Sequence, residues 1–151
     1  MNIKTELISF CQTYIEEHIL AATQAIADAR KSSANETKSS AGDKYETSRE
    51  MLQGVIEQYT HQLQEAQKLR ENLQMIIQNI SMTKKAGAGS VVETNSGNFF
   101  LAIPAGLTEI QGHKYTIISL YSPIGKLLLE KGKGDKLTFN GKEYTITKII
   151  N

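Results

Sequence analysis

The sequence predicts an α+β protein in which an N-terminal antiparallel coiled-coil hairpin, residues 1–81, precedes a small antiparallel β domain with one short helix, residues 82–151. Three observations predict this class. A helical apolar period is confined to the first part. The second part holds nine of the eleven glycines and both prolines. It also holds the two clearest turn signals, and a composition change of this size marks a boundary between modules.

Composition excludes several classes of protein. Hydrophobic residues make up 40% and charged residues 22%, a balance that excludes general disorder. The net charge of +1 gives no reason to expect binding to naked nucleic acid through phosphate neutralisation. One cysteine and three scattered histidines exclude an internal disulfide framework and argue against a structural zinc site.

The chain also lacks signals for a membrane or for export. No apolar run approaches the roughly 18 residues that a membrane-spanning helix needs. The first residues form no cleavable signal pattern. We therefore expect a cytoplasmic protein without membrane attachment.

Two apolar series predict the helices of the hairpin. The first runs from Leu7 to Ala29 and the second from Leu52 to Ile80, each with two apolar positions in a seven-residue repeat. Residues 32–44 between them are polar and rich in small side chains, which is typical of a loop. Two long amphipathic helices joined by a short loop fold back on each other as an antiparallel pair.

The second part predicts about five strands and one helix. Strands are expected at residues 90–94 and 98–103 around Asn95-Ser96-Gly97, at 114–120, and at 137–139 and 143–149 around Asn140-Gly141. A short helix is expected over residues 123–129, because Ser122 can cap it and Pro123 suits its first position. These elements make a compact module in which a sheet is covered by a helix.

Few residues carry catalytic chemistry by themselves. Cys11 lies on the apolar stripe of the first helix without a nearby histidine base, so we expect a packed core cysteine instead of a nucleophile. The glycines lack the spacing of a phosphate-binding loop. We therefore expect no enzyme activity of its own and no intrinsic cofactor. Gly54, inside the second helix, marks either a bend or a close approach of the helices.

The loop of the hairpin carries the acids of greatest interest. Glu36 and Asp43 lie there with Lys38 and Lys44. One interpretation is a solvated loop. The other is a hairpin that carries its carboxylates into the cleft of another molecule, where they help to hold Mg²⁺, an ion that takes one or two protein carboxylates.

A string in the second part resembles a known family. The segment from Ser122 to Asp135, with the hairpin and last strand after it, resembles the C-terminal domain of the Gre transcript-cleavage factors. That family shows Ser-Pro-Ile-Ala-Arg/Lys, then Leu-Ile-Gly-Lys, Gly-Asp and a glycine hairpin. The residues that match in order are Ser122, Pro123, Ile124, Lys126, Leu128, Lys131, Gly134 and Asp135. A coiled coil precedes this domain in the family as well, so the resemblance covers nearly the whole chain.

The resemblance implies a fold and a partner. Residues 82–151 would have an FKBP-like fold without isomerase activity and would dock at the rim of the secondary channel of bacterial RNA polymerase. Ser122, Pro123, Ile124 and Lys126 would shape the docking surface. The protein would be a cytoplasmic monomer that modulates elongation, with DNA binding expected and with the transcript 3′ end contacted only indirectly.

The resemblance also implies a chemical role for the tip of the hairpin. In family members that stimulate cleavage, the coiled coil enters the channel and two tip acids help to hold a second Mg²⁺. The polymerase then hydrolyses the 3′ end of a backtracked transcript by two-metal chemistry. Here Glu36 and Asp43 would be those acids, with Mg²⁺ shared with the polymerase.

The tip departs from the family pattern, which reads Gly-Asp-x-x-Glu-Asn-Ala-Glu-Tyr. Aligned on Tyr45, the loop here is about two residues longer. Glu36 stands where the family has Asp, and the family Glu falls on Ser39 or Ser40. Asp43 corresponds to the later acid of the pattern.

The altered tip leaves three functions open. A single carboxylate binds Mg²⁺ weakly, and Lys38 and Lys44 oppose the ion electrostatically. The first function is an elongation factor that stimulates cleavage through Glu36 and Asp43. The second is a regulator or inhibitor that occupies the channel without stimulating cleavage. The third is a coiled-coil interaction adaptor unrelated to transcription, whose apolar seam recruits a second hairpin or another partner.

Overall fold

The computed structural model of the chain describes residues 2–36, 42–80 and 82–151, apart from the side chains of residues 33, 35, 36 and 42–47. The chain forms two compact units. One comprises Met1–Gln12 with Glu71–Asn151, and the other Thr13–Arg70. The division expected at residue 81 falls in the connection between the last long helix and the first strand. The compact units instead divide the two long helices, because the helix ends group with the sheet.

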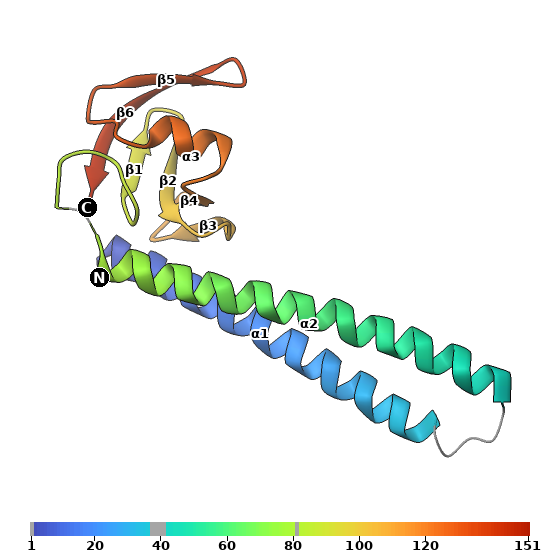
Figure 1. Cartoon of the computed structure of the whole chain (residues 1–151). Coiled ribbons are helices and arrows are strands. Elements are labelled where there is room, and N and C mark those ends of the chain that lie inside the picture. Colours follow the sequence, from blue (N-terminus) through green and yellow to red (C-terminus); the bar gives the residue numbers. More distant parts are fainter. Residues whose placement is uncertain (1, 37–41, 81) are drawn as a thin grey trace. The chain divides into compact units, whose positions relative to one another are not determined.

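Two long helices form the predicted hairpin. Helix α1 spans Ile3–Glu36 and helix α2 spans Gly42–Gln78. With 34 and 37 residues, they are about 51 and 55 Å long at 1.5 Å per residue. In the unit Thr13–Arg70 they run antiparallel side by side (Figure 1).

The helices extend into the segment 32–44 that the sequence predicts as a loop. Residues 32–36 and 42–44 are helical. Each residue added to an existing helix gains one hydrogen bond, and polar residues such as Ser and Asn have only slightly unfavourable propensities. A polar composition is therefore a weak stop signal. The connection 37–41, which includes Lys38, Ser39 and Ser40, lies outside the described residues.

The apolar stripe of α1 is buried as its heptad pattern predicts. Ile15, Ala22 and Ala29 recur at seven-residue intervals and are at most 6% exposed. On α2, Ala66 is buried in the same unit. Glu16 and Arg70 join the helices at the surface, with 2.7 Å between Oε1 and Nη2. Three of these four buried residues are alanines, and small buried side chains let two helices approach closely.

The second part of the chain forms a mostly antiparallel sheet. In the described residues the strands are β1 Val91–Thr94, β2 Gly97–Ala102, β3 Gly106–Ile110, β4 His113–Ser119, β5 Lys136–Phe139 and β6 Lys142–Ile150. Their order is β3-β4-β2-β1-β6-β5, and only the β2–β4 pair is parallel. The α+β class and the five predicted strands are confirmed. Asn140 and Gly141 have φ of 50° and 76°, as a two-residue hairpin turn requires.

The sequence did not predict strand β3. β3 lies at the edge of the sheet and pairs only with β4. All five of its residues are exposed or half-buried, and its sequence Gly-Leu-Thr-Glu-Ile does not alternate apolar and polar residues. β3 is a strand because its backbone forms hydrogen bonds with β4, and no pattern in its own sequence predicts this.

Both faces of the sheet are covered. The adjacent residues Val91 and Val92 point to opposite faces, and both are fully buried. On one face Val92 joins Leu101 and Ile146 in an apolar cluster with Leu128 of helix α3, Pro123–Leu128. At Gly89, beside this sheet, an added Cβ would lie 3.0 Å from Cγ1 of Ile80, at the end of the hairpin. In the described residues no helix is long and apolar enough to cross a membrane.

Candidate functional site

Helix α3 begins as the sequence predicts. Ser122 is its N-cap, and Oγ of Ser122 accepts a hydrogen bond of 3.1 Å from the amide of Gly125. The same hydroxyl donates a hydrogen bond of 2.6 Å to the carbonyl of Ser119. Pro123 occupies the first turn, where its missing N–H costs nothing. The Ser-Pro pair therefore fixes the direction in which the chain leaves β4.

The four residues that the resemblance assigns to a docking surface divide into two groups. The hydroxyl of Ser122 caps helix α3, and Ile124 is half-buried against the apolar cluster of the sheet. Pro123 and Lys126 are exposed. The first two therefore build the helix, whereas the second two are accessible to a partner.

Three apolar side chains that the sequence reasoning did not single out lie beside them. Tyr121 is 83% exposed, and Leu127 and Leu129 are each 39% exposed. A helix this short buries one leucine of the run 127–129, and it buries Leu128 fully. The triple leucine was the signal that could have predicted this. We call Tyr121, Pro123, Lys126, Leu127 and Leu129 the α3 surface.

Gly125 differs from the family pattern, which has Ala at this point. A Cβ added to Gly125 would lie 2.2 Å from the carbonyl oxygen of Ser119 and 2.7 Å from Oγ of Ser122. Contacts under 3.0 Å require something to shift, and backbone shifts at cost. In this chain the capped turn is closed so tightly that only glycine fits.

The tip acids lie at helix ends. Glu36 is the last residue of α1 and Asp43 is the second residue of α2. Their side chains, and that of Lys44, lie outside the described residues. An acid in the first turn of a helix is favoured by the helix dipole and an acid in the last turn is disfavoured. Among the residues that the structure describes, no group of three or more His, Cys, Asp or Glu side chains could hold a metal ion.

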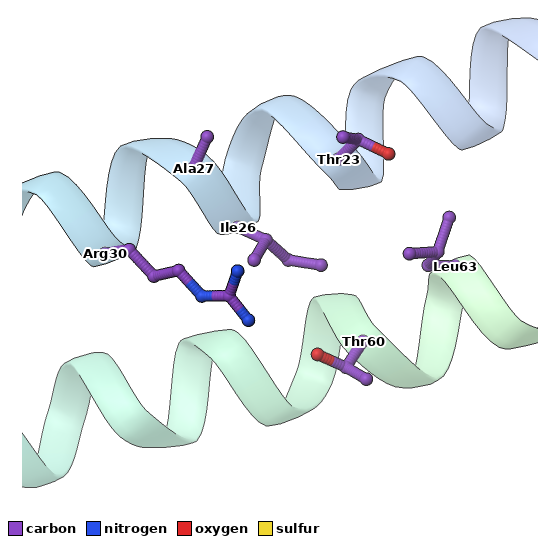
Figure 2. Close-up of a pocket in the computed structure, with 6 residues that line it drawn as sticks. All are labelled: Thr23, Ile26, Ala27, Arg30, Thr60 and Leu63. Atoms are coloured by element: carbon purple, nitrogen blue, oxygen red, sulfur yellow. The ribbon is translucent and has the colours of Figure 1, made fainter.

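A shallow groove lies between the helices of the hairpin (Figure 2). Its volume is about 280 Å³, and it is lined by Thr23, Ile26, Ala27, Arg30, Thr60 and Leu63. Thr23 and Thr60 each donate a hydrogen bond of 2.7 Å to a carbonyl of their own helix, which satisfies their hydroxyls. Arg30 extends toward α2 as the single charged lining group. With one cation and no base, the groove has no pair of groups for acid–base catalysis.

Cys11 is a core residue, as the sequence predicts. Its side chain is fully buried, and burial raises the pKa of the thiol to about 12. The thiolate is the nucleophilic form of cysteine. A thiol that stays protonated and has no access to solvent cannot act as a nucleophile near neutral pH.

Comparison of the chain with protein-family models, with curated proteins and with solved structures finds no match.

Proposed function

We propose that this chain is an elongation factor of the Gre type, which binds the secondary channel of bacterial RNA polymerase. The observation that carries the proposal is the turn at Ser122. Five of the eight residues that match the family lie on α3 or at its N-cap, and Pro123 and Lys126 are exposed there. Simple helix capping accounts for Ser122 and Pro123. It does not require an exposed Lys126 or the Gly134-Asp135 pair further along the string.

The helical hairpin supports the same proposal. Two helices of about 51 and 55 Å are far longer than the unit Thr13–Arg70 needs for a core, and the described part of that unit contains no other element. A helical pair of this length suits insertion into a channel. Residues 82–151, which we call the β module, would in this proposal be a variant of the FKBP-like domain that docks at the channel rim.

The chemistry would belong to the polymerase. Glu36 and Asp43 would supply carboxylates to a Mg²⁺ ion at the polymerase centre, and that ion would stabilise the attacking and leaving oxygens of the hydrolysis. The chain itself would be a monomer in the cytoplasm, without intrinsic cofactor and without enzyme activity of its own.

A second candidate function follows from the tip sequence. Ser39 or Ser40 stands where the family has its Glu, and Lys38 and Lys44 flank the remaining acids. Fewer carboxylates and added cations weaken binding of Mg²⁺. The chain would then occupy the channel without stimulating cleavage and would exclude other channel factors.

The adaptor function has its own observation. Leu20 and Met51 on the hairpin are 66% and 69% exposed. Contiguous exposed apolar patches mark contact with another protein, and in this candidate function Leu20 and Met51 would belong to one. Sedimentation of the full chain separates the candidates, because an adaptor that pairs two hairpins sediments as a dimer and a Gre-type factor as a monomer.

The decisive experiment is transcript cleavage by purified bacterial RNA polymerase in defined backtracked complexes with Mg²⁺. A Gre-type factor accelerates cleavage, and the double variant Glu36→Ala/Asp43→Ala abolishes the acceleration while polymerase binding persists. The matched control is Glu17→Ala/Glu57→Ala, which removes two exposed helix acids away from the tip. Acceleration that survives in the tip variant contradicts the role of Glu36 and Asp43.

Competition resolves the remaining outcomes. A chain that fails to accelerate cleavage but displaces a cleavage-competent factor is a non-cleaving channel occupant. A chain that does neither contradicts the proposal altogether. Docking is tested by Lys126→Ala, which weakens polymerase binding, whereas Lys114→Ala, an exposed lysine on β4, leaves binding unchanged.

A further inference from the structure

We propose that a lysine-lined pocket of the β module binds the phosphate groups of a di- or triphosphate anion. The pocket has a volume of about 280 Å³ and is lined by Thr83, Lys84, Lys133, Lys148, Ile149 and Asn151. We call it the lysine pocket. This inference is independent of the proposed function, because it uses neither the tip acids nor the α3 surface.

The pocket is assembled from three segments that are far apart in the sequence. Lys84 lies in the connection between α2 and β1, Lys133 in the turn before β5, and Lys148 on β6. Lysines separated by this many residues approach one another only when the tertiary structure brings their segments together. The convergence of three cations is therefore a property of the fold.

Hydrogen bonds hold the first of these segments against β6. The side-chain amide of Asn151 donates to the carbonyl of Thr83 and, over 3.1 Å, to that of Lys85. Oδ1 of Asn151 accepts a hydrogen bond from the hydroxyl of Ser90. The backbone that carries Lys84 is thereby tied beside the strand that carries Lys148.

Backbone hydrogen bonds hold the second segment in the same way. The amide of Ala86 donates to the carbonyl of Lys131, and the amide of Glu130 donates to the carbonyl of Ala86, both over 2.8 Å. The amide of Gly134 donates to the carbonyl of Ile146 over 2.8 Å. Lys133 therefore lies on a turn that is anchored on both sides, so the backbone segments that carry the three exposed lysines are held together.

The positive charge of the pocket is not cancelled by ion pairs. The salt bridges of lysine in the described residues are Lys68–Glu65 and Lys136–Glu143, and neither involves a lysine of the pocket. Asp135 is the nearest acid in sequence to Lys133, and its carboxylate accepts a hydrogen bond of 2.8 Å from the amide of Gly132.

One further acid lies opposite the pocket in the sheet register. Glu93 of β1 is the cross-strand neighbour of Lys148. It forms no ion pair with Lys148 and does not line the pocket. The pKa of Tyr115 on β4 is raised first by burial and second by the negative charge of Glu93, so the field of Glu93 also reaches β4. No Asp or Glu side chain lines the pocket, and three lysine ammonium groups leave it positively charged even beside the α-carboxylate of Asn151, which favours an anion.

The chemistry and size of the pocket indicate which anion. Lysine ammonium groups bind phosphate as mobile point charges with three donors each. At about 280 Å³ the pocket lies just below the usual range of ligand pockets, roughly 300–1,000 Å³. That size suits a di- or triphosphate group, either free or as the end of a nucleotide whose remainder extends into solvent. Three separated cations match two or three phosphoryl groups better than a single carboxylate.

The test is calorimetric titration of the full chain with pyrophosphate, and with adenosine diphosphate as the nucleotide probe. We expect saturable binding at one site that weakens as ionic strength rises. Glu93→Gln should tighten binding, because it removes the neighbouring negative charge. Equal affinity for the two probes assigns recognition to the phosphates alone. Tighter binding of the nucleotide adds a contact from the nucleoside.

Lysine variants decide whether the pocket is the site. Each of Lys84→Gln, Lys133→Gln and Lys148→Gln should weaken pyrophosphate binding about fivefold, and the triple variant should abolish measurable binding. The matched control is the triple variant at Lys31, Lys114 and Lys142, which removes the same charge from exposed positions elsewhere. Equal loss in the control triple, unchanged affinity in the pocket triple, or no binding by the unaltered chain overturns the proposal.

Discussion

Replacing Gly125 by alanine should destabilise the β module, although the same change stabilises most helices. Alanine is favoured over glycine inside a helix by about 1 kcal/mol. Gly125 lies in helix α3, so propensity alone predicts a gain. The opposite sign is expected because the added methyl has no room. It would lie 2.2 Å from a backbone carbonyl oxygen, whereas ordinary van der Waals contact begins at 3.4 Å.

The magnitude follows from what must move. To admit the methyl, the Ser119 carbonyl and the Ser122 hydroxyl must shift, and both take part in the cap of α3. Losing an N-cap costs about 1 kcal/mol. Forcing an extra carbon into a packed site costs about 1–3 kcal/mol. After subtraction of the propensity gain, the net loss is roughly 1–3 kcal/mol.

Amide hydrogen exchange measures this loss in the module itself. The amide of Leu101 donates over 3.0 Å to the carbonyl of Ser90 inside the sheet, so its protection reports the opening of the module. Gly125→Ala should lower that protection roughly 5- to 150-fold. On the same samples, circular dichroism in a urea titration measures the unfolding of the helices.

Gly54→Ala is the matched control. Gly54 is exposed in α2, and an added Cβ there would meet nothing within 4 Å. That open space excludes a close helix approach as the reason for this glycine. The control should gain about 1 kcal/mol. If Gly125→Ala is also neutral or stabilising, the tight closure at Ser119 is refuted, and an alanine at this point, as in the family pattern, fits this chain as well.

Three other predictions concern the core and the hairpin. The Cys11 thiol should react with iodoacetamide at pH 8 only after unfolding, because burial raises its pKa to about 12. The folded chain holds Cys11 as the neutral thiol. The free energy of unfolding should therefore keep its full value below the usual thiol pKa of about 8.5 and should fall as pH rises above it. Cys11→Ala should lose that alkaline sensitivity, and rapid labelling of the native chain would contradict the assignment. Phe100→Ala, at a fully buried ring, should cost about 3–5 kcal/mol in urea unfolding, and a loss below about 1 kcal/mol would refute its place in the core. Glu16→Ala should cost less than about 1 kcal/mol, since the pair with Arg70 is exposed, and a double-mutant cycle with Arg70→Ala should show a coupling that fades at high salt.

Local chemistry made much of the fold predictable from the sequence. The heptad spacing of Ile15, Ala22 and Ala29 identifies a helix face whatever the rest of the chain does, because 3.6 residues per turn place those positions together. Asn140-Gly141 and Ser122-Pro123 act over two to four residues, through positive φ and through a hydroxyl that caps an amide. These signals need no knowledge of distant partners. The family resemblance, and not these local signals, named Pro123 and Lys126, which are two of the five residues of the α3 surface.

The remainder depends on partners that are distant in the sequence. β3 exists as a strand because β4 offers it a row of backbone groups, and the parallel pairing of β2 with β4 reflects how the chain crosses over. Tyr121 and Leu127 are exposed because α3 packs with Leu128 toward the sheet. The lysine pocket forms because hydrogen bonds of Asn151 hold the segment of Lys84 beside β6. The sequence alone determines helix period, turns and caps, because those interactions span a few residues. Only the tertiary structure decides edge pairing, exposed faces and converging charges, because each depends on where a remote segment packs.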